Sequence, residues 1–475
     1  MEKEPSTSGS LTEKRFAETV REIPLRRALN LVQTTFMGVG TAICGTMFAI
    51  MGRAVETAGP SIVVTFLIGS FFALFLGICY AELGAAVPSG AGGAVSFVRR
   101  AFGERIPTFL AGWFDLIGSI SDCALGAMVF AFSIHYFVRW IEPFSLAVIT
   151  LIFFALITFK GVGSTGRVQF ILTAILIFSL CIYMVGSSSS FEMRRFEPFF
   201  PKGFLPTVFM VSYIFPTYAG YETITQLSEE VKTAGKTIPR ALFLTLIFIT
   251  LLFTGTAIAT IGGAPPEVYA GSDTPLQDAA NYFMGPMGGI VVSLASIIAT
   301  LSTINGSMAG ATRIAYALGR SSLLPSFLSS IHPKYRVPYA SLALTTLLAI
   351  IFVLTKSVDF IVYAIALGYT VTAMIVALAL MRLRKTEPHL YRPFKVPLYP
   401  YTVVSAIFAL VIMLITLSVE SLILGLALGL FGIGFLTFAR KIKRRKSRKT
   451  KNLELSQIPN SPIHKNLLSN KTQWD

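Results

Sequence analysis

The sequence predicts an all-α polytopic membrane protein with twelve transmembrane helices, and three observations carry this prediction. The first is composition: 53% of the 475 residues are apolar and only 13% are charged, a balance that water-soluble domains seldom have. The second is that apolar runs of about 18 to 25 residues recur along the chain, each long enough to cross a hydrocarbon core of ~30 Å as a helix. The third is the distribution of the basic residues, which follows the sidedness of membrane proteins.

The apolar runs define twelve expected spans, separated by short polar stretches. Their approximate limits are 31–51, 60–81, 108–138, 144–159, 166–187, 206–224, 240–262, 286–316, 340–355, 359–382, 399–419 and 421–439. Residues 1–30 are charged throughout and contain no short apolar core before a small-residue cleavage site, so we expect a cytoplasmic tail and no cleaved signal peptide. Residues 31–439 then form the membrane domain.

The net charge of +16 is distributed as in a membrane protein whose two ends lie in the cytoplasm. Cytoplasmic loops carry the excess of Lys and Arg, and twelve spans with the N-terminus inside place most of the 40 basic residues on that side. The other side keeps Arg53, Arg139, Arg194, Arg195, Lys202 and Lys356. We therefore expect a multi-pass protein of the cell membrane with both termini in the cytoplasm.

A basic run, RKIKRRKSRKTK, follows the last span from Arg440 to Lys451. We interpret it as the flank that stops translocation, and binding to anionic lipid headgroups is the alternative. Residues 440–475 as a whole are expected to be a disordered cytoplasmic tail.

Two spans contain residues that break helices. In span 1 the segment Gly38–Phe48 reads GVGTAICGTMF, with three glycines within eight residues, and in span 6 the segment Phe215–Glu222 reads FPTYAGYE, with Pro216 and Gly220 inside it. Non-helical backbone at mid-membrane is tolerated only where it lines a cavity or a binding site. The alternative is that the glycines only allow close helix packing and the proline only kinks its helix.

If five helices make one repeat unit, spans 1 and 6 are the first members of two successive units. Broken helices at matching positions indicate an inverted repeat, in which the half-helix N-termini face an anionic group and the unwound carbonyls face a cation or an ammonium group. An α-amino acid carries both groups.

Five segments in this order resemble motifs of one family. They are GVGTAICGTMF, the loop AELGAAVPSGAGGAVSFVRRAFG from Ala81 to Gly103, FPTYAGYE, the segment SEEVKTAGKTIPRAL after it, and INGSMAGATRIAYALGRSSLLPSFLSSIHPKYRVP. From about Leu31 to Tyr399 the chain is similar to the amino acid, polyamine and organocation (APC) transporter superfamily. It departs from the family pattern at Cys44 and Thr46, at Thr233 and Ala234, and at Ser321 and Ser322.

The resemblance implies a fold and an activity. The fold would be leucine-transporter-like, with a five-plus-five inverted repeat (about 31–187 and 206–382) and helices 11 and 12 (about 399–439) outside it. The activity would be secondary active transport of amino acids by alternating access, as symport with sodium or protons or as exchange, with no cofactor and no enzymatic reaction. A transporter of polyamines or other organic cations, and a non-transporting sensor on the same fold, remain the alternatives. The oligomeric state is not predicted.

The resemblance also implies a central substrate site at the two breaks. The substrate carboxylate would meet the backbone amides of Cys44, Gly45 and Thr46. Its amino group would meet carbonyls near Thr41, Ala42 and Phe215. The side-chain pocket would be bordered by Tyr218, Ala219 and Gly220.

Three acidic residues lie within expected spans rather than at their end residues, and there an ionisable group indicates function by default. Asp115 and Asp122 are seven residues apart, hence nearly on one helical face, and could bind a cationic substrate or a cation, or carry a proton. Glu222 could gate the site or contact a basic substrate. The alternatives are a satisfied structural role for the two aspartates and, for Glu222, a hydrogen bond that stabilises unwound backbone.

Span 8 offers hydroxyl and amide groups close to the expected break of span 1. These are Thr300, Ser302, Thr303 and Asn305, which could complete a sodium site with span 1 carbonyls or could serve only as helix-packing contacts. Many family members carry a lysine on span 5 near the expected cation position. This chain has Leu176 there. None of the histidines stands at a metal-ligand spacing, so no metal site is expected.

Overall fold

The computed structural model describes residues 25, 27–43, 45–87, 92–272, 274–417, 419, 422–434 and 436–437. Every extended regular element in these residues is a helix, and the described β-structure is one isolated bridge between Leu29 and Val231. The chain divides into two units, Met1–Leu426 and Ala427–Asp475, and the described part of the second unit is helical. The basic run from Arg440 to Lys451 lies outside the described residues.

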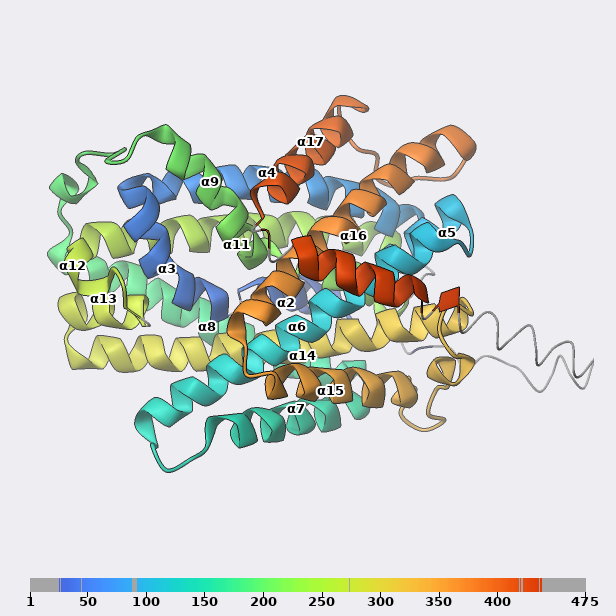
Figure 1. Ribbon diagram of the computed structural model, residues 1–475, viewed down its shortest axis with the longest axis horizontal. Helices are drawn as coiled ribbons and strands as arrows, with labels where there is room; N and C mark the ends of the chain where they lie inside the picture. Colours follow the sequence, from blue (N-terminus) through green and yellow to red (C-terminus); the bar gives the residue numbers. More distant parts are fainter. Residues whose placement is uncertain are drawn as a thin grey trace, which may run out of the picture. The chain divides into compact units, whose positions relative to one another are not determined.

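The helices follow the expected spans in chain order (Figure 1). They are α2 (Leu31–Ala42) and α3 (Gly45–Ala58) for span 1, α4 (Ile62–Ala86), α6 (Ile106–Phe137), α7 (Pro143–Phe159), α8 (Val162–Gly186), α9 (Phe204–Ile214) with α10 (Thr223–Gln226) for span 6, α11 (Ala234–Gly263), α14 (Pro286–Arg320), α15 (Tyr339–Leu354), α16 (Val358–Thr386), α17 (Tyr401–Thr416) and a last helix, Leu422–Gly434. Within the described chain six helical stretches are long and apolar enough to cross a membrane, and four further apolar helices are shorter. The all-α polytopic fold class is confirmed.

Three helices lie where the sequence suggests only loops. They are α5 (Ala94–Phe102), α12 (Pro266–Tyr269) and α13 (Pro275–Met284). Helix α5 is bracketed by Gly93 and Gly103, both of which have positive φ, a conformation that glycine adopts at low cost. Helix α5 has nine residues, so a search for apolar runs long enough to span a membrane does not find it.

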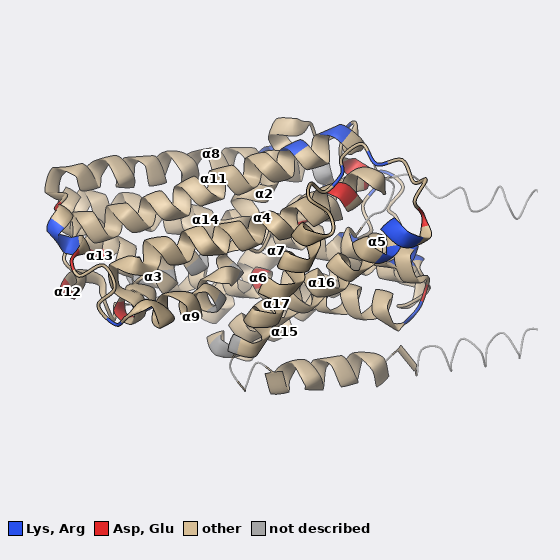
Figure 2. Cartoon of the chain, turned by 90° about the horizontal axis from the view of Figure 1, so that it is seen from above, with Lys and Arg blue, Asp and Glu red and all other residues tan. Residues whose placement is uncertain are grey.

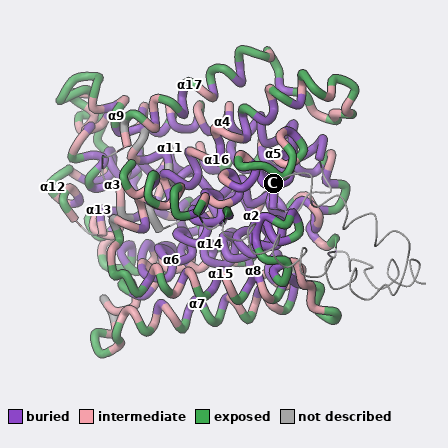
Figure 3. Tube along the Cα trace, turned by 45° about the vertical axis from the view of Figure 1, so that its right-hand side comes forward, coloured by how far each residue is buried: buried purple, intermediate pink, exposed green. Residues whose placement is uncertain are grey.

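Burial separates the interior helices from the peripheral ones. In the most apolar stretches of α6 and α16, 72% of the residues are buried, against 33% for α8. Figure 3 shows buried positions concentrated on the interior helices, with α7 and α17 at opposite edges. Lipid gives helices no hydrophobic reason to associate, so close packing of small residues and interhelical hydrogen bonds hold the interior together.

Charged residues of the first unit lie mainly at two ends, one near α5 and the other near α12 and α13 (Figure 2). At the α5 end, Glu82 is fully buried and pairs with Arg384 and, at 3.0 Å, with Arg392. The more exposed pair Arg100–Glu387 lies at the same end, at 2.8 Å. Hydrogen bonds from Arg100 hold the pKa of the Glu387 carboxyl below its ordinary value.

We expect the substitution Glu82→Ala to lower the free energy of unfolding by about 3–5 kcal/mol, because it leaves buried guanidinium groups without a carboxylate. Arg100→Ala is the control, since it removes a pair whose two side chains are 38% and 35% exposed, and should cost less than about 1 kcal/mol. Denaturant unfolding of the purified protein measures both. If both substitutions lowered the free energy of unfolding by the same amount, the buried ion pairs of Glu82 would be no more stabilising than the exposed pair of Arg100.

Candidate functional site

The first break separates α2 from α3. Helix α2 ends at Ala42, and Ile43 leaves the helical conformation with φ −78° and ψ 76°. Cys44 lies outside the described residues, and the backbone of Gly45 and Thr46 forms the first turn of α3. The first N–H groups of a helix have no partner within it and carry partial positive charge, so this turn offers the donors that the expected carboxylate site requires.

The second break separates α9 from α10. After Ile214 the chain continues as a 3₁₀ turn, Phe215–Tyr218, and then as an irregular turn before α10 begins at Thr223. Gly220 has φ +109°. Both carboxylate oxygens of Glu222 accept a hydrogen bond from the Gly220 N–H at 3.0 Å, so Glu222 stabilises the unwound backbone directly.

The two breaks touch each other. A Cβ atom at Gly220 would lie 2.8 Å from the carbonyl carbon of Thr41 and 2.9 Å from the nitrogen of Ala42. Only glycine permits so close an approach of the two backbones, and only glycine adopts this φ without strain. The structure therefore brings Gly220 of the second break against Thr41 and Ala42 of the first.

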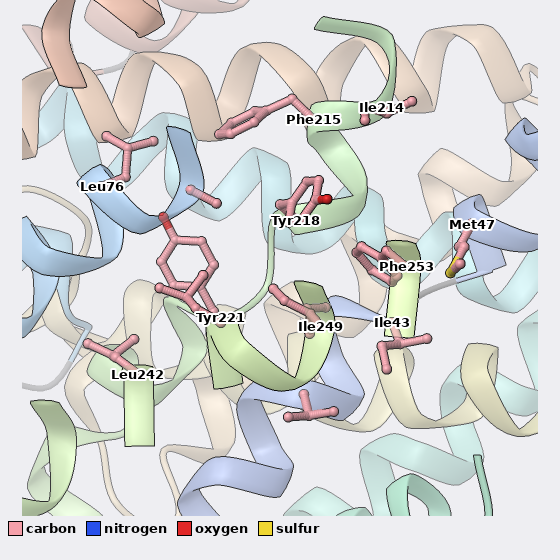
Figure 4. Close-up of a cluster of buried hydrophobic side chains, with 14 of the residues drawn as sticks. Ile43, Met47, Leu76, Ile214, Phe215, Tyr218, Tyr221, Leu242, Ile249 and Phe253 are labelled. Atoms are coloured by element: carbon pink, nitrogen blue, oxygen red, sulfur yellow. The ribbon is translucent and has the colours of Figure 1, made fainter. Parts of the chain in front are cut away.

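Both breaks contribute side chains to a cluster of buried apolar residues (Figure 4). Ile43 comes from the first break, Phe215 and Tyr218 from the second, and all three are buried. The Tyr218 hydroxyl donates to the Phe66 carbonyl of α4 at 2.7 Å and accepts from Ser70 at 2.9 Å. Tyr218 is therefore fixed in position, and the site combines backbone polar groups with an apolar wall.

Asp115 and Asp122 are buried on α6 but are bound to different helices. The amide of Gln226, on α10, donates to Asp115 at 3.1 Å, and the hydroxyl of Tyr369, on α16, donates to Asp122. Neither aspartate has an ion-pair partner among the described residues, and Glu222 lies close enough to interact electrostatically with both. Sequence reasoning missed Gln226 and Tyr369, although both are polar residues in apolar surroundings.

The four polar residues of span 8 divide into two groups. The Ser302 hydroxyl donates to the Gly40 carbonyl of α2 at 2.9 Å, and the Asn305 amide contacts α8. The hydroxyls of Thr300 and Thr303 donate to carbonyls of their own helix. The structure thus brings Ser302, but not the two threonines, to the end of α2, and the sodium site remains a prediction.

The end of the molecule at which α2 begins is closed. Glu230 and Arg313 form a fully buried ion pair of 2.8 Å, and the chain before α2 is bound to the segment after α10 through the Leu29–Val231 bridge. At the opposite end a cavity of about 290 Å³ lies between the end of α3 and α12, with Arg195 among its lining residues.

The long apolar helices, two of which are interrupted at touching breaks, define a multi-pass membrane protein. Residues 29–435 match the family model of the amino acid permeases. The chain is 24% identical over 411 residues to a branched-chain amino acid permease of Bacillus subtilis, which covers 81% of this chain and 87% of that protein. It is 25% identical over 394 residues to a branched-chain amino acid permease of Lactococcus lactis (77% and 84%) and 23% identical over 418 residues to a methylthioribose transporter of B. subtilis (82% and 89%). The chain belongs to the amino acid permease family, and it is a transport protein and not an enzyme.

We expect Gly220→Ala to abolish substrate uptake and to destabilise the protein, because the new Cβ meets the backbone of Thr41. The control is Gly203→Ala, since Gly203 also has positive φ, +80°, but a Cβ there would meet nothing within 4 Å. Backbone strain of about 1–3 kcal/mol applies to both positions, and only Gly220→Ala adds the clash. Uptake and unfolding assays that could not tell the two variants apart would show that the contact between the breaks has no role.

Proposed function

We propose that the protein is a secondary active transporter that carries amino acids across the cell membrane by alternating access. The observation that carries the proposal is the contact between the breaks at Gly220 and Thr41. The N–H groups of α3, the unwound carbonyls and an apolar wall would then lie around this contact. These are the groups that would recognise a carboxylate, an ammonium group and an apolar side chain.

The substrate that these groups fit best is a neutral amino acid with an apolar side chain. The buried Ile43, Phe215 and Tyr218 support this choice, and two of the similar proteins are named as branched-chain amino acid permeases. The rival is a cationic substrate, such as a polyamine or another organic cation. Its support is the pair of aspartates on α6, which have no cationic partner among the described residues.

Two conformational features support alternating access. One end is closed by the Glu230–Arg313 pair, while the cavity beside α3 lies at the other end. Asp115 and Asp122 tie α6 to α10 and α16, so movement of either helix would change the contacts of a buried carboxylate. The transport mode is symport with sodium or protons, or exchange, and both termini are proposed to lie in the cytoplasm.

Uptake by the purified protein in liposomes tests the function. We expect labelled leucine to enter when unlabelled leucine is inside, and to compete with isoleucine and valine but not with putrescine. A sodium or a proton gradient that drives accumulation would identify the coupling ion, and uptake that needs internal substrate would define an exchanger. The absence of leucine uptake in folded protein would overturn the proposal, and saturable putrescine uptake would favour the rival.

A further inference from the structure

The cavity at the end of α3 is separate from the two breaks. It lies between three parts of the chain, which are the last turn of α3 with the residues after it, the segment 195–201, and the end of α11 with α12. Helix α3 has 14 residues, and at the rise of an α-helix its two ends are about 20 Å apart. A molecule in this cavity would therefore not meet a substrate bound at the first turn of α3. The volume of about 290 Å³ is enough for a small organic molecule.

Much of the cavity wall is apolar and poor in hydrogen-bond donors. Proline has no backbone N–H, so the prolines of the wall contribute ring surface and carbonyl oxygens but no donor. The apolar residues that line the cavity are Val55, Pro60, Pro198, Pro201, Ile261 and Pro266. Such a wall suits a ligand that has an apolar body and brings its own donors.

The charged groups of the cavity leave carboxylates without a cationic partner. Arg195 forms an ion pair with Glu192 at 2.8 Å and donates to two backbone carbonyls, so its charge is compensated within the protein. Glu56 and Glu197 also line the cavity, and neither forms an ion pair among the described residues. An anionic ligand would be repelled by these two carboxylates, whereas a cationic ligand would be attracted.

The same end of α3 already holds one ammonium group. The Lys202 Nζ donates to the Glu56 carbonyl at 2.8 Å, as expected where a helix C-terminus carries partial negative charge. With Lys202 and Arg195 counted against Glu56, Glu192 and Glu197, one negative charge remains in excess. The cavity therefore favours a further cation.

A buried hydroxyl completes the polar groups of the cavity. Tyr269 of α12 lines the cavity and is fully buried, and its hydroxyl has no hydrogen-bond partner among the described residues. Burial raises the pKa of this hydroxyl above its ordinary value, so it keeps its proton and can both donate and accept. A buried polar group without a partner is costly, and a ligand with a donor would satisfy it.

We propose that this cavity is a second binding site and that it takes a small organic amine. The ammonium group would lie at Glu56 and Glu197 and donate to the Tyr269 hydroxyl, and the apolar part would lie against Ile261 and the prolines. The bound amine would connect α3 with α12, which pack against each other. Because the site lies apart from the breaks, the inference goes beyond the proposed transport function and does not depend on it.

Isothermal titration calorimetry of the full-length protein in detergent tests the proposal. The probe is isopentylammonium chloride, titrated in the presence of saturating leucine. We expect saturable binding of the amine that leucine does not prevent. Isopentanol, which has the same apolar body without the charge, should not bind measurably.

Substitutions in the cavity show where the amine binds. Glu56→Gln combined with Glu197→Gln should lower the affinity about fivefold or more, as expected for ion pairs near the surface. Tyr269→Phe should lower the affinity without lowering the melting temperature, because the lost hydroxyl has no partner in the free protein. The matched control is Glu267→Gln, an exposed carboxylate of α12 outside the lining, which should change the affinity less than about twofold.

Three results would overturn the proposal. They are binding of isopentanol as tight as that of the amine, displacement of the amine by leucine, and an affinity that neither the double substitution nor Tyr269→Phe lowers. The readout is binding, so a failure of leucine uptake would overturn the transport function and leave this inference standing.

Discussion

The constraint on which the structure depends is that backbone polar groups inside a membrane must find partners within the protein. Two interrupted helices leave such groups exposed at the centre of the molecule. At the first break, the Ser302 hydroxyl donates a hydrogen bond to the Gly40 carbonyl. At the second break, both carboxylate oxygens of Glu222 accept a hydrogen bond from the Gly220 N–H. The first turn of α3 adds further N–H groups at the same place, and a substrate carboxylate is the natural partner for them.

The helices around the breaks are arranged so that each break has its own support. Helix α4 fixes Tyr218 through the Phe66 carbonyl and Ser70, while α8 and α14 fix the end of α2 through Gln169 and Ser302. The supports are polar contacts between long apolar helices, and such contacts are worth only about 0.6 kcal/mol each on average in a membrane. Small individual energies suit a protein whose helices must change partners during transport.

The sequence predicts the fold and the position of the breaks because both are local properties. Apolar length identifies the spans, and glycine and proline in GVGTAICG and FPTYAGYE identify the interruptions. The contact of Gly220 with Thr41 and the pairing of Asp122 with Tyr369 join residues far apart in the chain. Periodicity and spacing carry no information on such pairs. Gln169 was missed for the same reason, since its partners Ser302 and Asn305 lie on another helix.

The central claim is that substrate binds where the two breaks meet. The most direct test is an experimental structure of the protein in lipid nanodiscs with saturating leucine. The account predicts density for leucine beside the contact of Gly220 with Thr41, with the carboxylate at the first turn of α3 and the side chain against Phe215 and Tyr218. Leucine density at any other position would contradict it.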